Sequence, residues 1–251
     1  MNIYVKIDAI EVISMFILSS DYDGTLKTRI HDLYINIREI NKFRELGNIF
    51  VLNTGRPFKS IKKEIDEFNI KFDYLCCNDG CVTFDSNFDV VFETNLTASQ
   101  KNHIKNLVIN FHGFEINKYY SAKLMLQKEI ENPIEIEIVK PQEASFKEFI
   151  LQLDKTETNI QHFEWKNSLF VKNNSSKSAA LENISKLIDS TINPYNIYTI
   201  GDEANDLEMI KNHRGFRMLE SSPKLWFTTW RIVPEVHYLV KYLNYKSKRT
   251  K

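Results

Sequence analysis

Apolar residues in the first eighty positions occur in two alternating patterns, short continuous runs and longer stretches with helical spacing. The run that ends at Leu18, segment 48–52 and segment 74–77 have the length and composition of buried strands. Segments 32–46 and 60–68 lie between these runs and carry apolar side chains mostly three or four positions apart, as an amphipathic helix does. Strands that alternate with helices in this way predict right-handed crossovers and a parallel sheet.

A mixed pattern replaces this alternation after residue 80. Segments with the pattern of strands or hairpins are 81–94, 133–139 and 162–171, and segments with helical spacing are 98–111 and 146–153. The mixture predicts a separate α+β domain inserted over residues 81–172. No change in composition marks the edges of this insert, so its boundaries rest on the pattern alone.

The alternating pattern returns after the insert and predicts that residues 173–251 complete the domain begun by residues 1–80. The expected elements are a helix over 178–188, strands over 197–200 and 215–219, and a closing helix over 235–243. Residues 1–11 precede the first buried strand and either add an edge strand or pack outside the sheet. The basic residues 246–251 are interpreted as a solvated, frayed terminus.

The composition is typical of a compact globular protein of one large or two modest domains, with 251 residues of which 43% are hydrophobic. The formal net charge is zero, so we expect neither nucleic acid nor an anionic membrane as a partner. The apolar run 12–18 is too short to span a bilayer, and the mixed charges of Lys6, Asp8 and Glu11 are unlike a signal peptide. The sequence does not determine the oligomeric state, and we expect a monomer or a weak homo-oligomer.

The three cysteines, Cys76, Cys77 and Cys81, lie close together. Their odd number and the lack of a distant partner argue against a disulfide framework and for a reducing compartment. The chain has no second Cys/His pair at ligand spacing, so buried thiols are favoured over a zinc site. These observations predict a cytoplasmic protein.

The first buried strand ends in two carboxylates, Asp21 and Asp23, followed by a glycine. The two side chains point the same way in an extended strand end, so their charges repel each other. A fold retains such a pair where a cation or a shared proton offsets the cost. Ligands of open α/β sheets bind at the carboxyl ends of strands. We therefore interpret this stretch as the catalytic edge of the sheet.

Further polar groups follow the other predicted strands. Thr54 follows the second strand, and Asp202, Asn205 and Asp206 follow a later one, while Lys177 lies just before a helix on the return path. Carboxylates on rigid strand ends suit Mg²⁺, which binds one or two of them together with substrate phosphate and water. A hydroxyl, the amides of a glycine turn and a lysine are suited to bind a phosphoryl group. The pattern therefore favours phosphoryl chemistry.

Four short motifs follow one another along the chain: Asp21-Tyr22-Asp23-Gly24-Thr25, Asn53-Thr54-Gly55-Arg56, Lys177 and Gly201-Asp202-Glu203-Ala204-Asn205-Asp206. This ordered set resembles the haloacid dehalogenase (HAD) superfamily. Each motif alone is weak, whereas the ordered set at predicted strand and helix ends is specific. The Thr-Gly-Arg form and the insert after the third strand resemble the Cof-type sugar-phosphatase branch. The resemblance covers residues 15–210 and implies an α/β fold, with a Rossmann-like parallel-sheet core and a smaller inserted α+β cap of the C2 type.

The resemblance implies a Mg²⁺-dependent phosphatase that acts on a small phosphate ester such as a sugar phosphate. Asp21 would attack phosphorus and form an aspartyl-phosphate, and Asp23 would protonate the leaving alcohol and then help to activate water. The residues implied to bind the phosphoryl group or the substrate are Thr54, Gly55, Arg56, Lys177 and Asn205, of which Thr54 and Lys177 are also counted as catalytic. The residues implied to hold or orient Mg²⁺ are Asp21, Asp23 through its backbone carbonyl, Asp202 and Asp206.

Other functions remain open for the same residues. A phosphomutase or phosphotransferase would keep the nucleophile but shield the aspartyl-phosphate from water, and a non-catalytic sensor would bind a phosphorylated ligand without turnover. Taken singly, the motifs are also typical of ordinary turns, a helix cap and a solvated lysine, but this interpretation requires several coincidences at once. A receiver-type signalling domain has neither an insert of this size nor a Gly-Asp-x-x-Asn-Asp loop.

Several features depart from the family pattern. The Asn78-Asp79-Gly80 turn carries an extra aspartate, segment 217–222 lacks the usual Met-Gly-Asn-Ala, and the insert is short, which leaves the substrate undetermined. His162, Trp165 and Lys166 are candidates to line a substrate pocket. We predict instead that they belong to an ordinary strand of the insert with one packed aromatic side chain.

Overall fold

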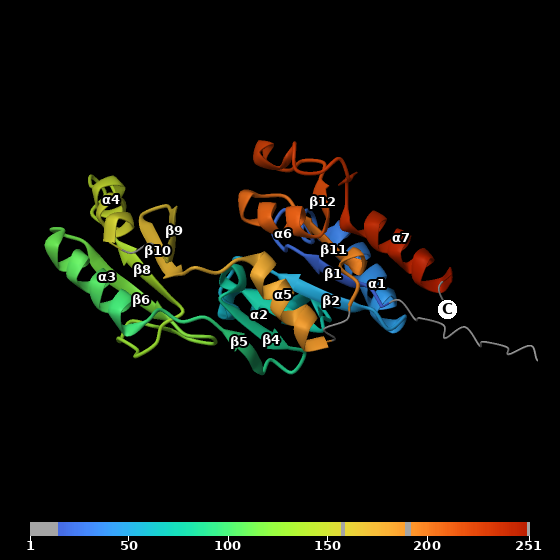
Figure 1. Cartoon of the computed structure of the whole chain (residues 1–251), viewed down its shortest axis with the longest axis horizontal. Coiled ribbons are helices and arrows are strands. Elements are labelled where there is room, and N and C mark those ends of the chain that lie inside the picture. Colours follow the sequence, from blue (N-terminus) through green and yellow to red (C-terminus); the bar gives the residue numbers. More distant parts are fainter. Residues whose placement is uncertain (1–14, 157–158, 189–191, 250–251) are drawn as a thin grey trace, which may run out of the picture.

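The computed structural model describes residues 15–156, 159–188 and 192–249, which form two β-sheets with helices packed on them (Figure 1). Residues 1–11, where the sequence allows an edge strand, lie outside this described part. The larger sheet has eight strands in the order β13-β12-β11-β1-β2-β3-β4-β5, and the smaller one has five in the order β7-β6-β8-β10-β9. The predicted α/β class with an α+β insert is confirmed.

Most elements coincide with the predicted segments to within a few residues. The strands of the larger sheet are β1 (Ile17–Ser20), β2 (Ile49–Asn53), β3 (Tyr74–Cys77), β4 (Val82–Asp85), β5 (Val90–Glu93), β11 (Ile197–Gly201), β12 (Arg214–Met218) and β13 (Ile232–Val233). The helices beside it are α1 (Ile30–Glu45), α2 (Phe58–Phe68), α5 (Lys177–Ile188), α6 (Leu207–Asn212) and α7 (Val236–Arg249). The smaller sheet contains β6 (Glu115–Tyr120), β7 (Met125–Leu126), β8 (Glu135–Val139), β9 (Ile160–Trp165) and β10 (Ser168–Asn173), with helices α3 (Ala98–Asn110) and α4 (Lys147–Thr156).

β1 lies inside the larger sheet and is buried along its whole length. It pairs in parallel with β2 and β11, so that Ser20 lies opposite Leu52 on one side and Ile200 on the other. Because these three strands run in the same direction and in register, their carboxyl ends meet at one edge of the sheet. The loops that follow these ends carry the predicted site.

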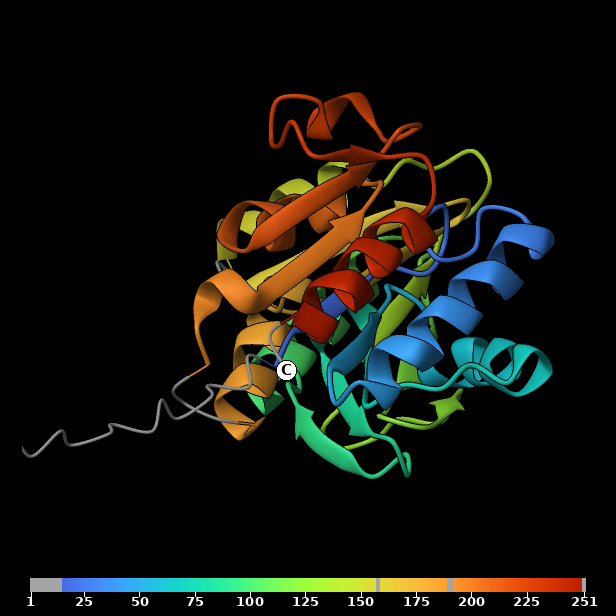
Figure 2. The same cartoon turned by 90° about the vertical axis from the view of Figure 1, so that its right-hand side faces the viewer.

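Helices cover both faces of the larger sheet, because its strands carry apolar side chains on both sides. Leu18 and Phe50 belong to the apolar cluster that includes side chains of α1, α2 and α7, whereas Ile17 and Val51 pack with α5 in another cluster. Successive side chains of a strand point to opposite faces, which explains this division. α1 and α7 lie side by side on one face (Figure 2). The result is a three-layer α/β/α arrangement.

The hairpin β4–β5, which follows residue 81, belongs to the larger sheet. β4 pairs antiparallel with β3, and Val82 and Phe84 are buried in the core of the larger sheet. Phe58 of α2 packs on Phe84, with ring centroids 4.6 Å apart. Burial of the apolar side chains of β4 against α2 explains why the hairpin extends the larger sheet.

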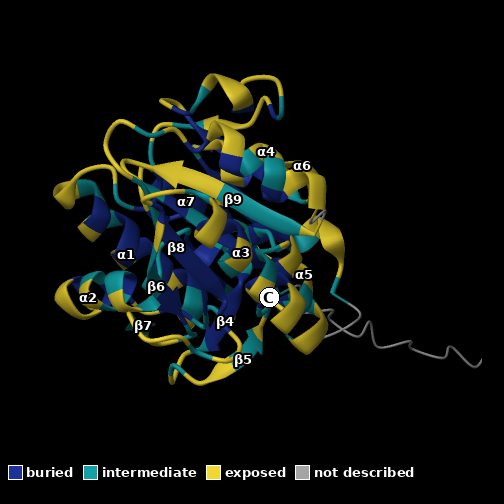
Figure 3. Cartoon of the chain, turned by 90° about the vertical axis from the view of Figure 1, so that its left-hand side faces the viewer, coloured by how far each residue is buried: buried dark blue, intermediate teal, exposed yellow. Residues whose placement is uncertain are grey.

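The smaller sheet is antiparallel, with one apolar face and an opposite face that carries charged and aromatic side chains. Ile136, Leu169 and Val171 are buried in a cluster with side chains of α3 and α4. Figure 3 shows β8 as buried, whereas the edge strand β9 is partly intermediate and partly exposed. Asn173 Nδ2 donates a hydrogen bond to the Asn95 carbonyl at 2.9 Å, so the two connections between the sheets lie side by side.

Two parts of the smaller sheet differ from the predicted segments. Segment 162–171 contains a hairpin rather than one strand, since β9 ends at Trp165, Lys166 has a positive φ of 56° and β10 begins at Ser168. The turn contains no Gly or Pro, so its sequence gives little turn signal. β6 and β7 form an additional hairpin that the pattern did not predict, because the charged and aromatic residues of β6 do not alternate cleanly.

The basic C-terminal segment is helical, contrary to the predicted frayed end, because α7 continues through residue 249. Residues 250–251 lie outside the described part. Ser247 is buried and accepts a hydrogen bond from Asn48 Nδ2 at 2.9 Å, and Lys246 Nζ donates to Tyr198 Oη at 3.0 Å. These contacts hold the last turns of α7 against the sheet.

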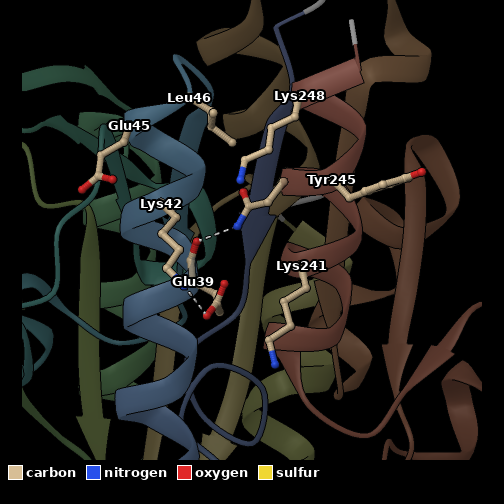
Figure 4. Close-up of a pocket in the computed structure, with 8 residues that line it drawn as sticks. Glu39, Lys42, Glu45, Leu46, Lys241, Tyr245 and Lys248 are labelled. Atoms are coloured by element: carbon tan, nitrogen blue, oxygen red, sulfur yellow. Dashed lines mark hydrogen bonds and ion pairs between the residues drawn. The ribbon is translucent and has the colours of Figure 1, made fainter.

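A groove of about 360 Å³ runs between α1 and α7 (Figure 4). Lys42 donates to the Glu39 carboxylate at 2.9 Å, and Asn244 Nδ2 donates to the Glu39 backbone carbonyl at 3.1 Å. None of the predicted site residues lines this groove. Its contacts therefore belong to the packing of the two helices.

The three cysteines are free and buried, which confirms the prediction of buried thiols. Burial raises the pKa of Cys76 to about 12 and that of Cys81 to about 11, so both thiols stay protonated at neutral pH. Among the described helices, none has the length and apolar character needed to cross a membrane.

Candidate active site

Three carboxylates converge at the edge where the parallel strands end. Asp21 follows β1, Asp202 follows β11, and Asp206 closes the short helical turn Ala204–Asp206. One oxygen of each lies within 4.8 Å of the others. Gly24, at φ 75°, lets its loop approach this cluster, because a Cβ at this position would lie 2.2 Å from Asp202 Oδ2. The structure therefore brings three of the predicted metal-site residues together.

Lys177 is fully buried between two of these carboxylates. Its Nζ donates to Asp21 Oδ1 at 2.5 Å and to Asp206 Oδ1 at 2.7 Å. Lys177 is the first residue of α5, and Asn53 Nδ2 donates to its backbone carbonyl at 3.0 Å. Burial alone lowers the pKa of Lys177, but the Asp206 and Asp21 carboxylates raise it above its ordinary value. The ammonium group therefore stays charged and offsets part of the acidic cluster.

Asp206 has both carboxylate oxygens engaged in hydrogen bonds. Oδ1 accepts from Lys177, and Oδ2 accepts from the backbone N–H groups of Asp202 and the next residue at 3.0 and 3.1 Å. Asp202 Oδ1 accepts from Thr25 Oγ1 at 2.7 Å. Asp206 therefore fixes the conformation of the loop formed by residues 202–206. Asp21 and Asp202 each keep one carboxylate oxygen without a hydrogen bond to any described residue.

The donor set fits a hard divalent cation. Burial raises the pKa of Asp21 well above its ordinary range; Lys177 opposes this effect and Asp206 adds to it. Burial likewise raises the pKa of Asp202. Three carboxylates around one ammonium group leave an excess of negative charge, which a cation bound to the remaining oxygens of Asp21 and Asp202 would neutralise. The residues present therefore suit Mg²⁺, with Asp206 holding the loop that carries Asp202.

The turn after β2 brings Thr54, Gly55 and Arg56 into the same cleft as Asp21. The Thr54 N–H donates to the Cys76 carbonyl at 2.9 Å, and Thr54 Oγ1 accepts from the Arg56 N–H at 3.1 Å. Thr54 is almost fully buried. These hydrogen bonds fix the conformation of the turn next to the acidic cluster.

Arg56 forms an ion pair with Asp23 in this cleft. Its Nε donates to Asp23 Oδ2 at 2.6 Å, its Nη2 donates to the other oxygen, and its Nη1 donates to Glu64 of α2 at 3.1 Å. The hydrogen bonds to Asp23 are the main cause that raises the pKa of Arg56. The Asp23 side chain is 53% exposed and stands outside the carboxylate cluster. Glu64 is a further site residue that the sequence analysis missed, since no motif marks it.

Asn205 donates to Asp79, the extra aspartate of the Asn-Asp-Gly turn, rather than to the carboxylate cluster. The distance from Asn205 Nδ2 to Asp79 Oδ1 is 2.8 Å, and Lys172 of β10 donates to Asp79 Oδ2 at 2.8 Å. All three residues line the cleft. The sequence analysis identified Asp79 only as a departure and did not single out Lys172, because a partner 93 residues away leaves no local signal.

The cleft has a volume of about 1570 Å³ and lies between the two sheets, with Asp21 in one wall and the smaller sheet in the other. Phe163 and Phe170 stack in the second wall, with ring centroids 4.8 Å apart and planes inclined by 9°. The Tyr120 ring lies 6.2 Å from that of Phe170. An aromatic surface therefore faces the loops that carry the carboxylates.

His162 and Trp165 also line the cleft, which corrects the prediction of an ordinary packed strand. Trp165 is 57% exposed, because β9 is an edge strand with only β10 as its neighbour. Lys166 Nζ lies 4.3 Å from the centre of the Trp165 ring. His162 Nε2 lies 3.0 Å from Asp154 Oδ1 of α4.

Glu135 is a buried carboxyl group in the wall of the cleft. Its Oε1 accepts a hydrogen bond from Asn78 Nδ2 at 3.2 Å. Burial raises the pKa of Glu135 to about 7, although the Lys172 ammonium group opposes this effect. Glu135 is therefore protonated in the folded protein at a pH where the unfolded chain has already lost that proton.

Glu135 is expected to make the free energy of unfolding decrease as the pH rises from 4.5, the ordinary pKa, to about 7. In this range the folded state binds up to one more proton than the unfolded state, so raising the pH favours unfolding by about 3 kcal/mol in total. Glu135→Gln cannot titrate and is expected to remove this slope in urea unfolding measured across the range. Glu143→Gln, at an exposed position, serves as the control. Equal slopes in wild type and Glu135→Gln would contradict the prediction.

The chain matches the family model of the haloacid dehalogenase-like hydrolases over residues 18–148 and 126–226. No curated protein matches it. The match includes both segments that supply the carboxylate cluster and the whole of the smaller sheet. More than half of the chain is therefore described by this one family.

Solved structures share the fold over nearly the whole chain. A HAD/COF-like hydrolase from Plasmodium vivax is 15% identical, with a TM-score of 0.71 over 95% of this chain and 97% of that one. A haloacid dehalogenase-like hydrolase from Bacteroides thetaiotaomicron is 16% identical, with a TM-score of 0.73 over 91% and 99%. The sucrose-phosphatase from Synechocystis, solved with sucrose and phosphate, is 14% identical, with a TM-score of 0.64 over 92% and 97%. The chain therefore belongs to the haloacid dehalogenase-like hydrolases, and its fold combines a larger, mainly parallel sheet with a smaller antiparallel one.

Proposed function

We propose that this hydrolase is a Mg²⁺-dependent phosphatase that releases inorganic phosphate from a small phosphorylated metabolite, most simply a sugar phosphate. The observation that carries the proposal is the 2.5 Å contact between Asp21 and Lys177 within the acidic cluster of the cleft. A carboxylate beside a buried ammonium group is suited to attack a phosphoryl group whose charge is neutralised at the same time. Phosphate esters hydrolyse so slowly in water that such positioning must supply most of the rate enhancement.

In the first step, an oxygen of Asp21 attacks phosphorus and the bond between phosphorus and the leaving oxygen breaks. Lys177 holds the other oxygen of Asp21 and so orients the attacking one. Asp23 takes up a proton from solvent once Arg56 releases it and gives that proton to the leaving oxygen, and an aspartyl-phosphate remains. Arg56 holds Asp23 in this structure, and phosphoryl oxygens that enter the cleft would compete for the guanidinium group and release Asp23 for this transfer.

In the second step, water attacks phosphorus, Asp23 takes a proton from the water, and the bond between phosphorus and Asp21 breaks. Inorganic phosphate leaves, Asp23 returns the proton to solvent, and both side chains are again carboxylates. The Thr54 hydroxyl and the Gly55 N–H would donate to the phosphoryl oxygens. Mg²⁺, held by Asp21, Asp202 and the Asp23 carbonyl, would offset the charge on those oxygens.

The aromatic wall of the cap supports a sugar as the leaving group. The apolar face of a sugar ring can pack on an aromatic face such as that of Phe163 or Phe170, while its hydroxyl groups need polar partners. Glu135 and Tyr120 offer such partners in the same wall. The likeness in fold to a sucrose-phosphatase is consistent with this assignment.

We further propose a division into two domains, in which the five-stranded sheet with α3 and α4 closes over the larger domain. We propose a cytoplasmic location, supported by the free, buried cysteines, and a monomer or weak homo-oligomer. The zero net charge supports a small-molecule substrate rather than nucleic acid as the partner.

Product analysis tests the proposed reaction. Purified protein with Mg²⁺ is expected to release inorganic phosphate from one or more members of a panel of phosphorylated sugars, nucleotides and cofactors. Positional isomerisation of a hexose phosphate without phosphate release would overturn the proposal in favour of a phosphomutase. Binding of panel members without turnover would overturn it in favour of a phospho-ligand sensor.

A further inference from the structure

The turn formed by residues 78–80 has an unusual backbone for its sequence. Asn78 and Asp79 both have left-handed φ angles, 51° and 52°, and Gly80 follows at 90°. Such conformations cost energy in residues other than glycine, although Asn and Asp adopt them more readily than most. A Cβ at Gly80 would lie 2.3 Å from the Ser176 carbonyl oxygen, so the turn touches the connection that returns from the cap. The turn is therefore held by its surroundings.

Hydrogen bonds tie this turn to the loop that carries Thr54. The Asn78 N–H donates to the Arg56 carbonyl at 3.1 Å, and the Asp79 N–H donates to the Thr54 carbonyl at 3.2 Å. The Asp79 side chain lies against the same loop, because a Cβ at Gly55 would be 2.9 Å from Asp79 Oδ1. Any shift of Asp79 would therefore disturb the Thr54–Arg56 turn.

The carboxylate of Asp79 also links the loop after β11 to the cap. Its Oδ1 accepts from Asn205 Nδ2 at 2.8 Å, and its Oδ2 accepts from Lys172 Nζ at 2.8 Å. Asn205 belongs to the loop that carries Asp202 and Asp206, and Lys172 belongs to β10 of the cap. One side chain thus contacts two catalytic loops and the last strand of the cap.

Lys172 is a buried cation that needs this partner. It is 3% exposed, and besides Asp79 it donates to the Asn78 carbonyl at 2.9 Å. Glu135 is its cross-strand neighbour on β8. Removing one member of a buried ion pair leaves an uncompensated charge, whereas removing both members can be nearly neutral.

We propose that Asp79 and Lys172 are positioning residues that join the cap to the catalytic loops of this phosphatase. Lys172 holds Asp79, and Asp79 in turn holds the Thr54–Gly55 turn and the Asn205 loop. The loops around Asp21 are then correctly placed only when Lys172 of β10 contacts Asp79. This inference rests on the proposed phosphatase function, and it gives the extra aspartate of the Asn-Asp-Gly turn a role.

A double-mutant cycle tests this coupling, with Asp79→Asn, Lys172→Met and the combined variant. Each single variant is expected to lower kcat for p-nitrophenyl phosphate by about 10- to 100-fold, as losses of supporting residues at metal sites do. The combined variant is expected to lose no more than the worse single one, because the two residues act through each other. Lys172→Arg, which keeps the charge and the donor, is expected to retain most of the activity. KM is expected to change little, since the small aryl group does not depend on cap contacts.

The control is Lys105→Met, which removes a half-exposed ion pair with Glu129 elsewhere in the cap. Thermal unfolding monitors the fold, and the combined variant is expected to unfold near the wild-type temperature even if a single variant does not. Losses that multiply in the combined variant, or single variants within twofold of wild-type kcat, would overturn the proposal.

Calorimetric titration with inorganic phosphate in the presence of Mg²⁺ keeps the test separate from the proposed activity. If wild type binds phosphate but hydrolyses no substrate, the proposed function fails. In that case the coupling still predicts at least about tenfold weaker binding in each single variant and no further loss in the combined one. Unchanged phosphate binding in both single variants would overturn the coupling itself.

Discussion

Replacing Asp21 by Asn is expected to abolish Mg²⁺-dependent hydrolysis of p-nitrophenyl phosphate, with a fall in kcat of about 10⁴-fold or more. The amide cannot form the aspartyl-phosphate, and removal of a covalent nucleophile costs enzymes losses of this order or larger. The buried site is expected to keep its fold, because the amide retains the shape of the carboxylate and removes one of three crowded negative charges. Initial rates of p-nitrophenol release give the measurement.

The matched control is Asp66→Asn, which removes an exposed carboxylate that pairs with Lys62 on α2 at 2.6 Å. This variant is expected to hydrolyse at the wild-type rate. If Asp21→Asn retained activity close to that of the control, Asp21 would not be the nucleophile. Thermal unfolding of both variants distinguishes loss of chemistry from loss of fold.

Replacing Lys177 by Met is expected to produce the largest loss of stability among single changes at this site, about 3 to 5 kcal/mol. The change leaves the buried Asp21 and Asp206 carboxylates without their shared ammonium partner, and uncompensated buried charges cost this much. Activity is expected to disappear as well, because Lys177 orients the Asp21 oxygen. Urea unfolding with and without Mg²⁺ is the measurement, and added Mg²⁺ is expected to recover part of the loss by binding the freed carboxylates.

Lys62→Met, which breaks the exposed pair with Asp66, is the control and is expected to change stability by less than about 1 kcal/mol. If Lys177→Met does not fold, the combination with Asp21→Asn is expected to fold, since one of the two unpaired charges is then removed. Stability of Lys177→Met equal to that of the control would contradict the electrostatic role given to this residue.

The parts of the site that could be predicted are those whose signal is local. The apolar run that ends at Leu18 lies just before Asp21, and the strand-like residues 197–200 lie just before Asp202, so each aspartate could be placed at a strand end without knowledge of the fold. The alternation of strands and helices then fixes the parallel order that brings these ends together. Local patterns and connectivity indicated that Asp21 and Asp202 lie at strand ends, whereas the role expected of Lys177 came from the resemblance to the haloacid dehalogenase superfamily.

The parts that could not be predicted depend on partners far away in the chain or on the exposure of an edge. A period of two residues shows that segment 81–94 is a hairpin, but it does not show which sheet the hairpin joins. The same limit applies to Trp165, whose exposure follows from the edge position of β9. The contacts of Arg56 with Glu64 and of Asp79 with Lys172 depend on charges whose pairing only the folded chain determines.

The adjacent crossings between the two sheets, tied together by the Asn173–Asn95 hydrogen bond, have a consequence for how such proteins diversify. A module that enters and leaves its host at neighbouring points can be lengthened, shortened or exchanged without altering the host's strand order. β1, β2 and β11 all lie outside the segment between these two crossings. If the protein is the phosphatase proposed above, new leaving-group preferences can therefore arise by replacement of the module while the phosphoryl transfer itself stays the same.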